Sequence, residues 1–151
     1  MRAVIQRVQH ARVEVDGQAT GQIEAGLLVF LGVGQNDTPE DIGWLAQKVV
    51  KVRVFEDSEA KMNLSVTDVG GEVLLISQFT LFGNLKKGTR PSFNRSAPPE
   101  HAIALYERFR SELASALGKP VPAGEFGAHM MIHALNDGPV TLVLDSKQRE
   151  F

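Results

Sequence analysis

The sequence predicts an α/β domain in which two helices cover one outer face of the sheet structure. Apolar residues repeat with helical spacing in two stretches, which begin at Pro39 and at Pro98. Several other runs are wholly apolar, or alternate apolar and polar residues, over strand lengths. A length of 151 residues fits a single domain, so we expect residues 1–151 to fold as one unit.

Strands are expected at the start of the chain. Residues 3–15 form a strand-like run whose second part alternates apolar and charged side chains. Asp16 and Gly17 both tolerate positive φ, so they predict a hairpin turn into a return strand that runs to about Ile23. Residues 26–33 are almost wholly apolar and predict a strand buried on both faces.

The first helix is expected to begin at Thr38. Thr38 is a suitable cap, Pro39 suits the first helical position, and acidic residues follow that favour the positive end of the helix dipole. We expect a short strand at residues 52–55 and a polar connection at residues 57–63. The buried helix face is expected to comprise Ile42, Leu45, Ala46, Val49 and Val50.

The second half repeats this order of elements. Residues 73–76 predict a buried strand, Pro98 opens a second helix and Gly118 suits its C-terminal cap. Residues 126–144 are strand-like, with a break at residues 137–139. The buried face of the second helix is expected to comprise Ala102, Tyr106, Phe109, Leu113 and Ala116.

The shared order suggests duplicated β-α-β units, although no residue-by-residue repeat is apparent. Two helices cannot cover both faces of a large sheet. We therefore expect a subunit partner on the uncovered face.

Composition restricts the classes of function. The chain has no cysteine, which excludes disulfides, a thiolate nucleophile and a Cys-ligated zinc site. It has no run of signal-peptide or membrane-spanning character, so we expect a cytoplasmic protein without a membrane partner. The formal net charge is −2, so contact with nucleic acid would need a local basic patch. The loop of residues 83–95 supplies one, since it holds Lys86, Lys87 and Arg90 and no acidic residue.

Two polar interruptions of apolar runs are candidates for a site. Ser77, Gln78 and Thr80 follow the buried strand, where they either cap the strand end or line a site. Gly138 and Pro139 interrupt the last strand, because proline cannot donate a sheet hydrogen bond. They form either an edge bulge or a rigid tip with outward carbonyls, and the sequence leaves the isomer of their peptide bond open.

Neither a metal site nor a conventional serine hydrolase is expected. His129 and His133 are four residues apart and would share one face of a strand, but no nearby carboxylate completes a ligand set. No Gly-x-Ser-x-Gly motif surrounds Ser77, and no His or Asp lies at motif spacing. We expect no metal and no cofactor.

The two polar segments together resemble the D-aminoacyl-tRNA deacylases, also called D-tyrosyl-tRNA deacylases. The signatures are Ser-Gln-Phe-Thr-Leu at residues 77–81 and Asn-Asp-Gly-Pro-Val-Thr at residues 136–141. The similarity covers almost the whole chain and includes further segments at residues 3–8, 61–64, 88–93 and 126–130. The charged tail at residues 145–151 is a departure from the family pattern.

The resemblance implies a homodimer with a layered β/β/α sandwich of mixed sheets. It also implies hydrolysis of the ester between a D-amino acid and the terminal adenosine of tRNA, with glycine mischarged on tRNA as a further substrate. The partner would thus be the tRNA acceptor end. In the family the Gly-Pro bond is cis, and the pair enters the pocket of the other subunit.

Carried over, the resemblance makes Gly138 and Pro139 a chiral filter whose carbonyls capture the substrate amino group. Arg7 would hold that tip, while Phe126 and Met130 would line the pocket around the adenosine. Asn136, which opens the second signature, belongs to the same substrate-binding group.

The first signature would carry the chemistry. Ser77 and Gln78 would position the adenosine, and the backbone N–H groups of Phe79 and Thr80 would stabilise the oxyanion. The Thr80 side chain is an alternative nucleophile, but it lacks a visible base, so we favour water assisted by the ribose 2′-OH. Lys86, Lys87 and Arg90 would meet tRNA phosphates, or belong to an ordinary solvated loop.

Two alternatives belong to other classes. The same fold could serve as a nucleic-acid-binding module without catalysis. The related editing domain of archaeal threonyl-tRNA synthetases is disfavoured, because no synthetase sequence is attached to this chain.

Overall fold

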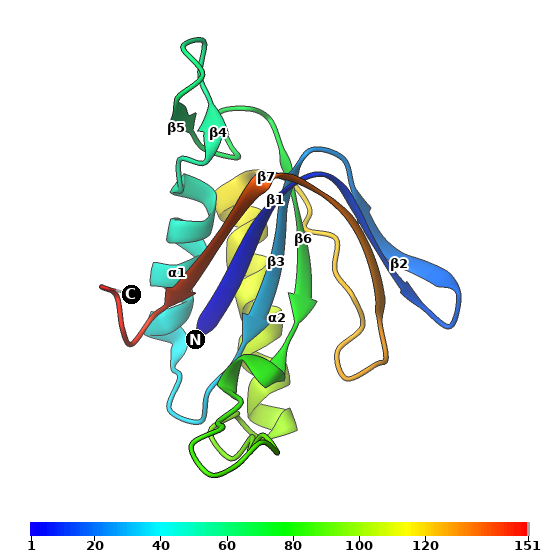
Figure 1. The fold of residues 1–151 in the computed structure, drawn as a ribbon, viewed down its shortest axis with the longest axis vertical. Coiled ribbons are helices and arrows are strands. Elements are labelled where there is room, and N and C mark those ends of the chain that lie inside the picture. The colour runs from blue at the N-terminus through cyan, green and yellow to red at the C-terminus, as the bar shows by residue number, and fades with distance from the viewer. Residues whose placement is uncertain (151) are drawn as a thin grey trace.

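The computed structural model describes residues 1–150 and consists of a curled sheet with two helices packed against it (Figure 1). The five strands of the sheet are β1 (Arg2–Val15), β2 (Gln18–Ile23), β3 (Gly26–Gly32), β6 (Glu72–Ser77) and β7 (Met131–Asp145). The helices are α1 (Pro39–Lys51), α2 (Pro99–Leu117) and the short 3₁₀ helix η1 (Phe79–Phe82). A separate two-stranded ribbon contains β4 (Phe55–Glu56) and β5 (Met62–Leu64).

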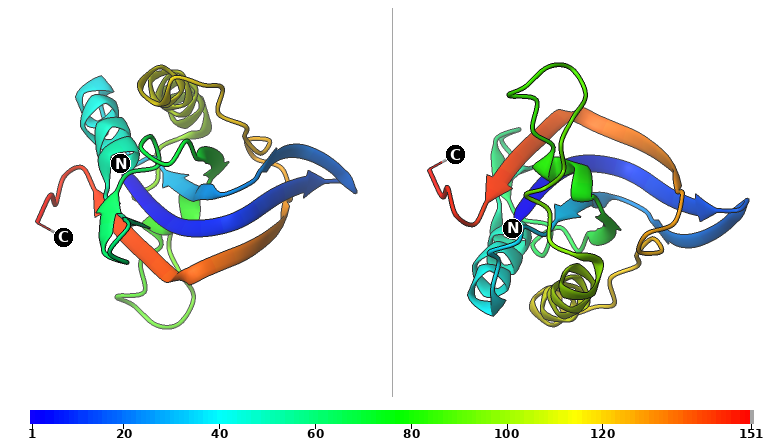
Figure 2. Two further views of the ribbon diagram at one scale, coloured as in Figure 1. Left: turned by 90° about the horizontal axis from the view of Figure 1, so that it is seen from above. Right: turned by 90° about the horizontal axis from the view of Figure 1, so that it is seen from below.

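Strand β1 is the centre of the sheet. One of its edges pairs with β7 along nearly its whole length, while the other pairs first with β3 and then with β2. The parallel pair of β3 and β6 extends the sheet beyond β1. Figure 2 shows that β1, β2 and β7 curve together, so the sheet curls over instead of remaining flat.

Both helices lie on one face of the sheet, and the larger core lies between the helices and the sheet (Figures 1 and 2). Apolar side chains of β1, β3 and β6 meet the predicted faces of α1 and α2 there. A smaller core around Val13, Leu28 and Leu74 lies inside the curl. The prediction of an α/β fold with two helices on one outer face is therefore confirmed.

The ends of the helices follow the expected local chemistry. The Asp41 carboxylate accepts hydrogen bonds from the Thr38 backbone N–H at 2.8 Å and from its hydroxyl at 3.2 Å. Although burial opposes ionisation of Asp41, hydrogen bonds from Lys147, Ser146 and Thr38 lower its pKa below the usual range. Gly118 ends α2 with φ +79°, a conformation that favours glycine.

Several predicted boundaries were wrong. The expected strand at residues 52–55 is only β4, because α1 continues to Lys51 and its cap follows. The polar connection of residues 57–63 includes β5 and forms the ribbon that projects at the top of Figure 1. The main sheet is one curled five-stranded sheet, and the layered β/β/α sandwich that the resemblance implies stays a prediction. Residues 126–130 precede β7 and are not part of a strand.

Strand β7 carries several exposed apolar side chains. Met131, Leu135, Leu142 and Val143 are large hydrophobic residues that are exposed along this strand. They agree with the expectation of a partner on the uncovered side, but the dimer and the duplicated units stay predictions. Among the described residues, neither helix is long and apolar enough to cross a membrane.

Candidate active site

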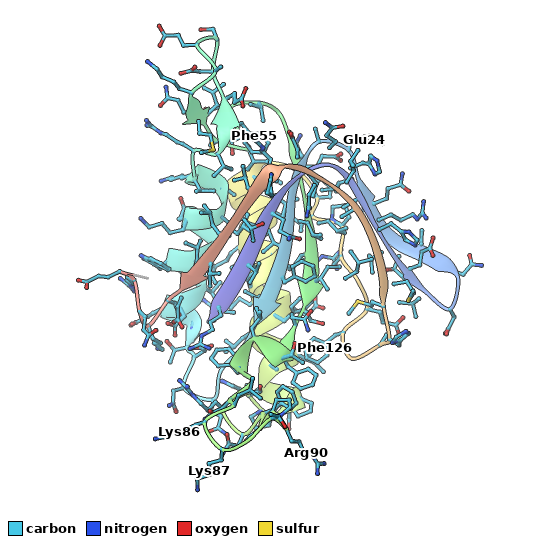
Figure 3. The ribbon with its side chains drawn as sticks, in the orientation of Figure 1. Glu24, Phe55, Lys86, Lys87, Arg90 and Phe126 are labelled. Atoms are coloured by element: carbon cyan, nitrogen blue, oxygen red, sulfur yellow. The ribbon has the colours of Figure 1, made fainter. Side chains whose placement is uncertain are left out.

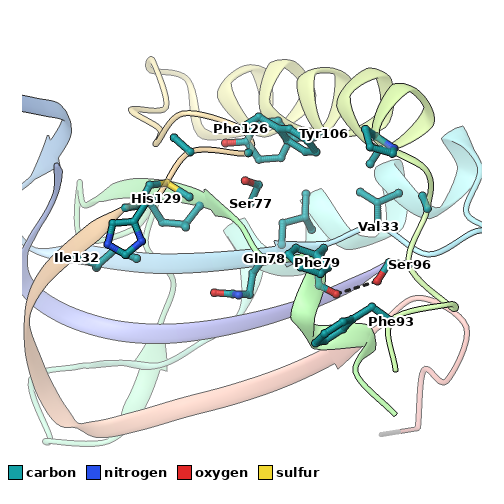
Figure 4. A pocket seen from close by; sticks show the side chains of 18 residues that line it. Val33, Ser77, Gln78, Phe79, Phe93, Ser96, Tyr106, Phe126, His129 and Ile132 are labelled. Atoms are coloured by element: carbon teal, nitrogen blue, oxygen red, sulfur yellow. Dashed lines mark hydrogen bonds between the residues drawn. The ribbon is translucent and has the colours of Figure 1, made fainter. Parts of the chain in front are cut away.

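A pocket of about 600 Å³ opens where β6 ends (Figure 4). Its walls come from the end of β6 with the start of η1, from α2 with the segment before it, and from residues 126–132. The lining side chains are mostly apolar. They are Leu31, Val33, Ile76, Ser77, Gln78, Phe79, Phe93, Ser96, Ala97, Pro99, Ala102, Tyr106, Phe126, Gly127, Ala128, His129, Met130 and Ile132.

The pocket brings together five of the predicted site residues: Ser77, Gln78, Phe79, Phe126 and Met130. Figure 4 shows Ser77 and Phe126 facing each other across it. Segments almost 50 residues apart in the sequence thus form one cavity. Of the two interpretations of Ser77 and Gln78, a cap of the strand end or the lining of a pocket, the structure favours the second. The apolar walls and few polar groups are typical of a small-molecule or nucleoside site.

The 3₁₀ helix η1 begins directly after Ser77 and Gln78, which line the pocket. The expected strand end is in fact this 3₁₀ turn, in which Leu81 N–H donates to the Gln78 carbonyl at 3.3 Å. A 3₁₀ turn leaves its first N–H groups without an acceptor inside the helix. Those groups belong to Phe79 and Thr80, the residues predicted as oxyanion donors. The Ser96 hydroxyl fixes this backbone by donating to the Phe79 carbonyl at 3.0 Å.

The Thr80 side chain does not line the pocket. It is exposed, and its hydroxyl accepts a hydrogen bond from the Gln78 side-chain amide at 2.5 Å. The position of this hydroxyl does not favour Thr80 as a nucleophile, and the role of its backbone N–H stays a prediction.

The Gly138–Pro139 bond is cis, and the pair lies where the register between β1 and β7 shifts. Arg7 lies at this irregularity and holds it. Its Nε donates to the Asp137 carbonyl at 3.0 Å, and its Nη1 donates to the Val54 carbonyl at 2.6 Å. Arg7 is only 7% exposed, and its bond to Val54 is buried, while its bond to Asp137 is part-buried.

The predicted filter residues are not at this chain's own pocket. Gly138, Pro139 and Asn136 are exposed and are absent from the pocket lining, as is Arg7. Gly138 has φ +139°, and a Cβ there would lie 2.6 Å from the backbone nitrogen of Val140. The tip therefore has a backbone conformation that requires glycine at position 138, and it does not line this chain's pocket.

The predicted tRNA-binding residues lie together at one end of the molecule. Figure 3 shows Lys86, Lys87 and Arg90 on the loop that connects η1 with α2. All three are exposed, and none of the ion pairs formed within residues 1–150 involves them. They are not part of the pocket lining.

Sequence reasoning missed Tyr106, Phe93 and Ser96 as pocket residues. Tyr106 was assigned to the apolar face of a helix, and its burial is indeed nearly complete. Burial raises its pKa to about 12, and its hydroxyl lies 3.4 Å from the Leu75 carbonyl. The phenol is therefore protonated at neutral pH. Phe93 lies in the basic loop and in the family-like segment of residues 88–93, and Ser96 directly follows the loop, but neither residue was assigned to the pocket from the sequence.

Few titratable groups reach the pocket. Of its described lining residues only Tyr106 and His129 carry an ionisable side chain, and no carboxylate contributes. His129 lies before β7, so the expectation that it shares a strand face with His133 was wrong. A ring nitrogen of His133 lies 3.3 Å from the Glu14 carboxylate. Within residues 1–150 no group of three or more His, Asp or Glu side chains is placed to hold a metal.

Comparison with known proteins agrees with this geometry. The D-Tyr-tRNA(Tyr) deacylase family matches residues 4–145. A D-aminoacyl-tRNA deacylase of Thermosipho africanus is 56% identical over 148 residues, which are 98% of this chain and 99% of the relative. One from Opitutus terrae is 56% identical over 150 residues, 99% of this chain and 100% of the relative.

Solved structures show the same fold. A "c-Myc DNA Unwinding Element Binding Protein" superimposes with a TM-score of 0.91 at 39% identity and covers 96% of this chain and 98% of its own. A probable eukaryotic D-amino acid tRNA deacylase gives a TM-score of 0.81 at 18% identity, over 95% of this chain and 97% of its own. The full-length match, together with a pocket built from the first signature, shows that this chain belongs to the D-Tyr-tRNA(Tyr) deacylase family.

Proposed function

We propose that this protein hydrolyses the ester bond of D-aminoacyl-tRNA, and of glycine mischarged on tRNA, to release free tRNA and the amino acid. The observation that carries the proposal is that Ser77, Gln78 and Phe79 line the same pocket as Phe126 and Met130. The proposal includes a cytoplasmic location, which suits a tRNA substrate, and a single deacylase domain over residues 1–151.

The terminal adenosine is the part of the substrate that suits the pocket. Phe126 packs edge-on against Tyr106 with ring centroids 5.6 Å apart, which fixes one apolar wall. Met130 also lines the pocket and packs against Gly124, where a Cβ would collide with the Met130 sulfur. Ser77 and Gln78 supply the polar groups that orient the ribose and the base.

The reaction needs little from the side chains. The oxygen of a water molecule bonds to the ester carbonyl carbon, and the charge on the carbonyl oxygen is stabilised by the N–H groups of Phe79 and Thr80. The bond from the carbon to the ribose 3′-oxygen then breaks, and that oxygen takes a proton. Since no carboxylate lines the pocket and Tyr106 stays protonated, the ribose 2′-OH orients the water and relays its proton.

Chirality is read by a second subunit. The Gly138–Pro139 tip of one protomer inserts into the pocket of its partner, and its carbonyls accept hydrogen bonds from the substrate amino group. This backbone contact leaves no room for an L side chain, whereas D side chains and glycine fit. Three observations support the proposal: the tip is exposed, it is absent from its own pocket, and β7 carries bare apolar residues.

The loop that holds Lys86, Lys87 and Arg90 meets the phosphates of the acceptor stem. Within residues 1–150 the three cations have no ion-pair partner, so they can neutralise phosphates without breaking an ion pair there. Affinity for tRNA should therefore fall as salt rises.

Deacylation of matched D-Tyr-tRNA and L-Tyr-tRNA in the presence of EDTA tests the proposal. We expect rapid release from the D ester only. Release from both esters would exclude the chiral filter. Release from neither ester, with or without added divalent metal, would exclude the proposed activity.

A second function is favoured by one observation. The solved structure that is 39% identical to this chain is titled a DNA-unwinding-element binding protein. The same basic loop could bind DNA in a module without catalysis. A gel-shift assay that showed tighter binding to duplex DNA than to tRNA, together with no deacylation, would favour this second function.

A further inference from the structure

An aromatic pair stands at the mouth of the pocket, partly inside and partly exposed. Phe79 is 57% exposed although it lines the cavity. Its ring meets that of Phe93 edge-on, with centroids 5.0 Å apart and planes at 68° (Figure 4). The exposed phenyl surface is therefore continuous with the apolar interior of the pocket.

The pair is held rigidly. The Ser96 hydroxyl donates to the Phe79 carbonyl at 3.0 Å, and the Ser96 N–H donates to the Phe93 carbonyl at 3.0 Å. Close packing fixes the Phe93 ring as well, because a Cβ on Gly83 would lie 3.2 Å from it. An aromatic surface that is fixed before binding loses little conformational entropy when a ligand stacks on it.

The surroundings of the pair are cationic. The loop between η1 and α2 contains Phe93 and carries Lys86, Lys87 and Arg90, all exposed and without an ion-pair partner among residues 1–150. An exposed aromatic surface beside unpaired cations is the combination with which proteins bind single-stranded nucleic acid. The rings stack on bases, and the cations contact the backbone phosphates.

We propose that Phe79 and Phe93 form a stacking subsite for the base of the nucleotide that precedes the terminal adenosine. The inference rests on the proposed function, which puts that adenosine in the pocket. The RNA strand must then leave through the mouth, where this pair is exposed. The loop cations would neutralise the phosphates that follow.

Substrates of increasing length test the subsite: D-tyrosyl esters of adenosine, of a dinucleotide and of a trinucleotide. In the wild type we expect kcat/KM to be about tenfold higher for the dinucleotide ester than for the adenosine ester, because stacking of one base on an aromatic side chain provides a gain of this size. The ratio of the two values should fall to about twofold or less in Phe93→Leu and in Phe79→Leu. The use of a ratio removes any effect of the substitution on the chemical step.

Met62→Ala is the matched control. Met62 is also 57% exposed, but it belongs to the ribbon at the opposite end of the molecule from Lys86 and Arg90 (Figures 1 and 3). This variant should keep the wild-type ratio. An unchanged ratio in both phenylalanine variants would overturn the subsite, as would a shift of oligomeric state in sedimentation, which would show that the pair is a subunit contact.

A binding measurement separates failure of the subsite from failure of the proposed activity. The probe is a dinucleotide that carries D-tyrosine in a non-hydrolysable amide and 2-aminopurine as its preceding base. We expect stacking to quench the fluorescence in the wild type and in Met62→Ala, but much less in Phe93→Leu. Equal quenching in all three proteins would contradict the subsite even if no ester were hydrolysed.

Discussion

The pocket and the Gly138–Pro139 tip differ in how much of their environment one chain supplies. The pocket is enclosed by η1, α2 and residues 126–132, and its aromatic walls support one another. The tip is equally well fixed from behind by Arg7, yet its outer side is exposed. One region is a cavity without a chiral filter, and the other is a rigid projection without a cavity. Two such incomplete parts are what a site shared between subunits requires.

The largest expected effect concerns the backbone of the pocket. Replacement of the Thr80 N–H by an ester oxygen should lower kcat about 10²- to 10³-fold, because it would remove one of the two proposed oxyanion donors. The same replacement at Leu81, whose N–H already donates within the turn, is the control and should chiefly affect stability. Single-turnover deacylation measures the effect, and equal losses at both positions would contradict the role of Thr80.

The support of the tip is expected to matter next. Arg7→Met leaves the buried carbonyl of Val54 and the part-buried carbonyl of Asp137 without their donor, so the free energy of unfolding should fall by about 2–4 kcal/mol. Urea unfolding measures this change. Arg12→Met on the same strand is the control, since the Arg12 side chain is 41% exposed. If folded Arg7→Met still preferred D esters over L esters, the Gly138–Pro139 tip would not depend on Arg7 for its function.

The burial of Tyr106 in the pocket wall should make the stability of the protein depend on pH in the alkaline range. The folded pKa of Tyr106, about 12, lies above the ordinary 10.0, so its stabilising contribution is complete below pH 10 and lost as pH rises toward 12. Over that range the wild type should lose about 2–3 kcal/mol more stability than Tyr106→Phe. Tyr106 is the only tyrosine, so phenolate absorbance follows it directly. A midpoint near pH 10 in the folded protein would contradict the buried wall.

The smallest effect is expected for the Thr80 side chain. Thr80→Ala removes a hydroxyl that is exposed and outside the pocket, so deacylation should change by less than about threefold. Abolished turnover in a variant that still folds and binds tRNA would restore Thr80 as the nucleophile.

The sequence predicted the parts of the site better than their arrangement. Ser77 and Gln78 stood out because polar residues end an apolar strand, and Gly138 and Pro139 because proline cannot continue a sheet. Tyr106 was hidden, since its spacing on α2 is that of a core residue. The short strand at residues 52–55 was wrongly predicted because its apolar residues serve the end of α1 and the core instead.

The separation of tip and pocket could not be read from local patterns. It follows from the curl of the sheet, which depends on how β7 pairs with β1 across more than 100 residues of sequence. The cis state of the Gly138–Pro139 bond was likewise left open by the residues alone.

Mixing two inactive variants tests the shared site most directly. Ser77→Phe fills the pocket but leaves the tip intact, while Gly138→Val distorts the tip, where a Cβ collides with Val140, and leaves the pocket open. Unfolded and refolded together in equal amounts, they should regain about a quarter of wild-type deacylation, because half of the dimers would carry one complete site. No recovered activity in mixtures that contain folded heterodimers would contradict a pocket and filter divided between subunits.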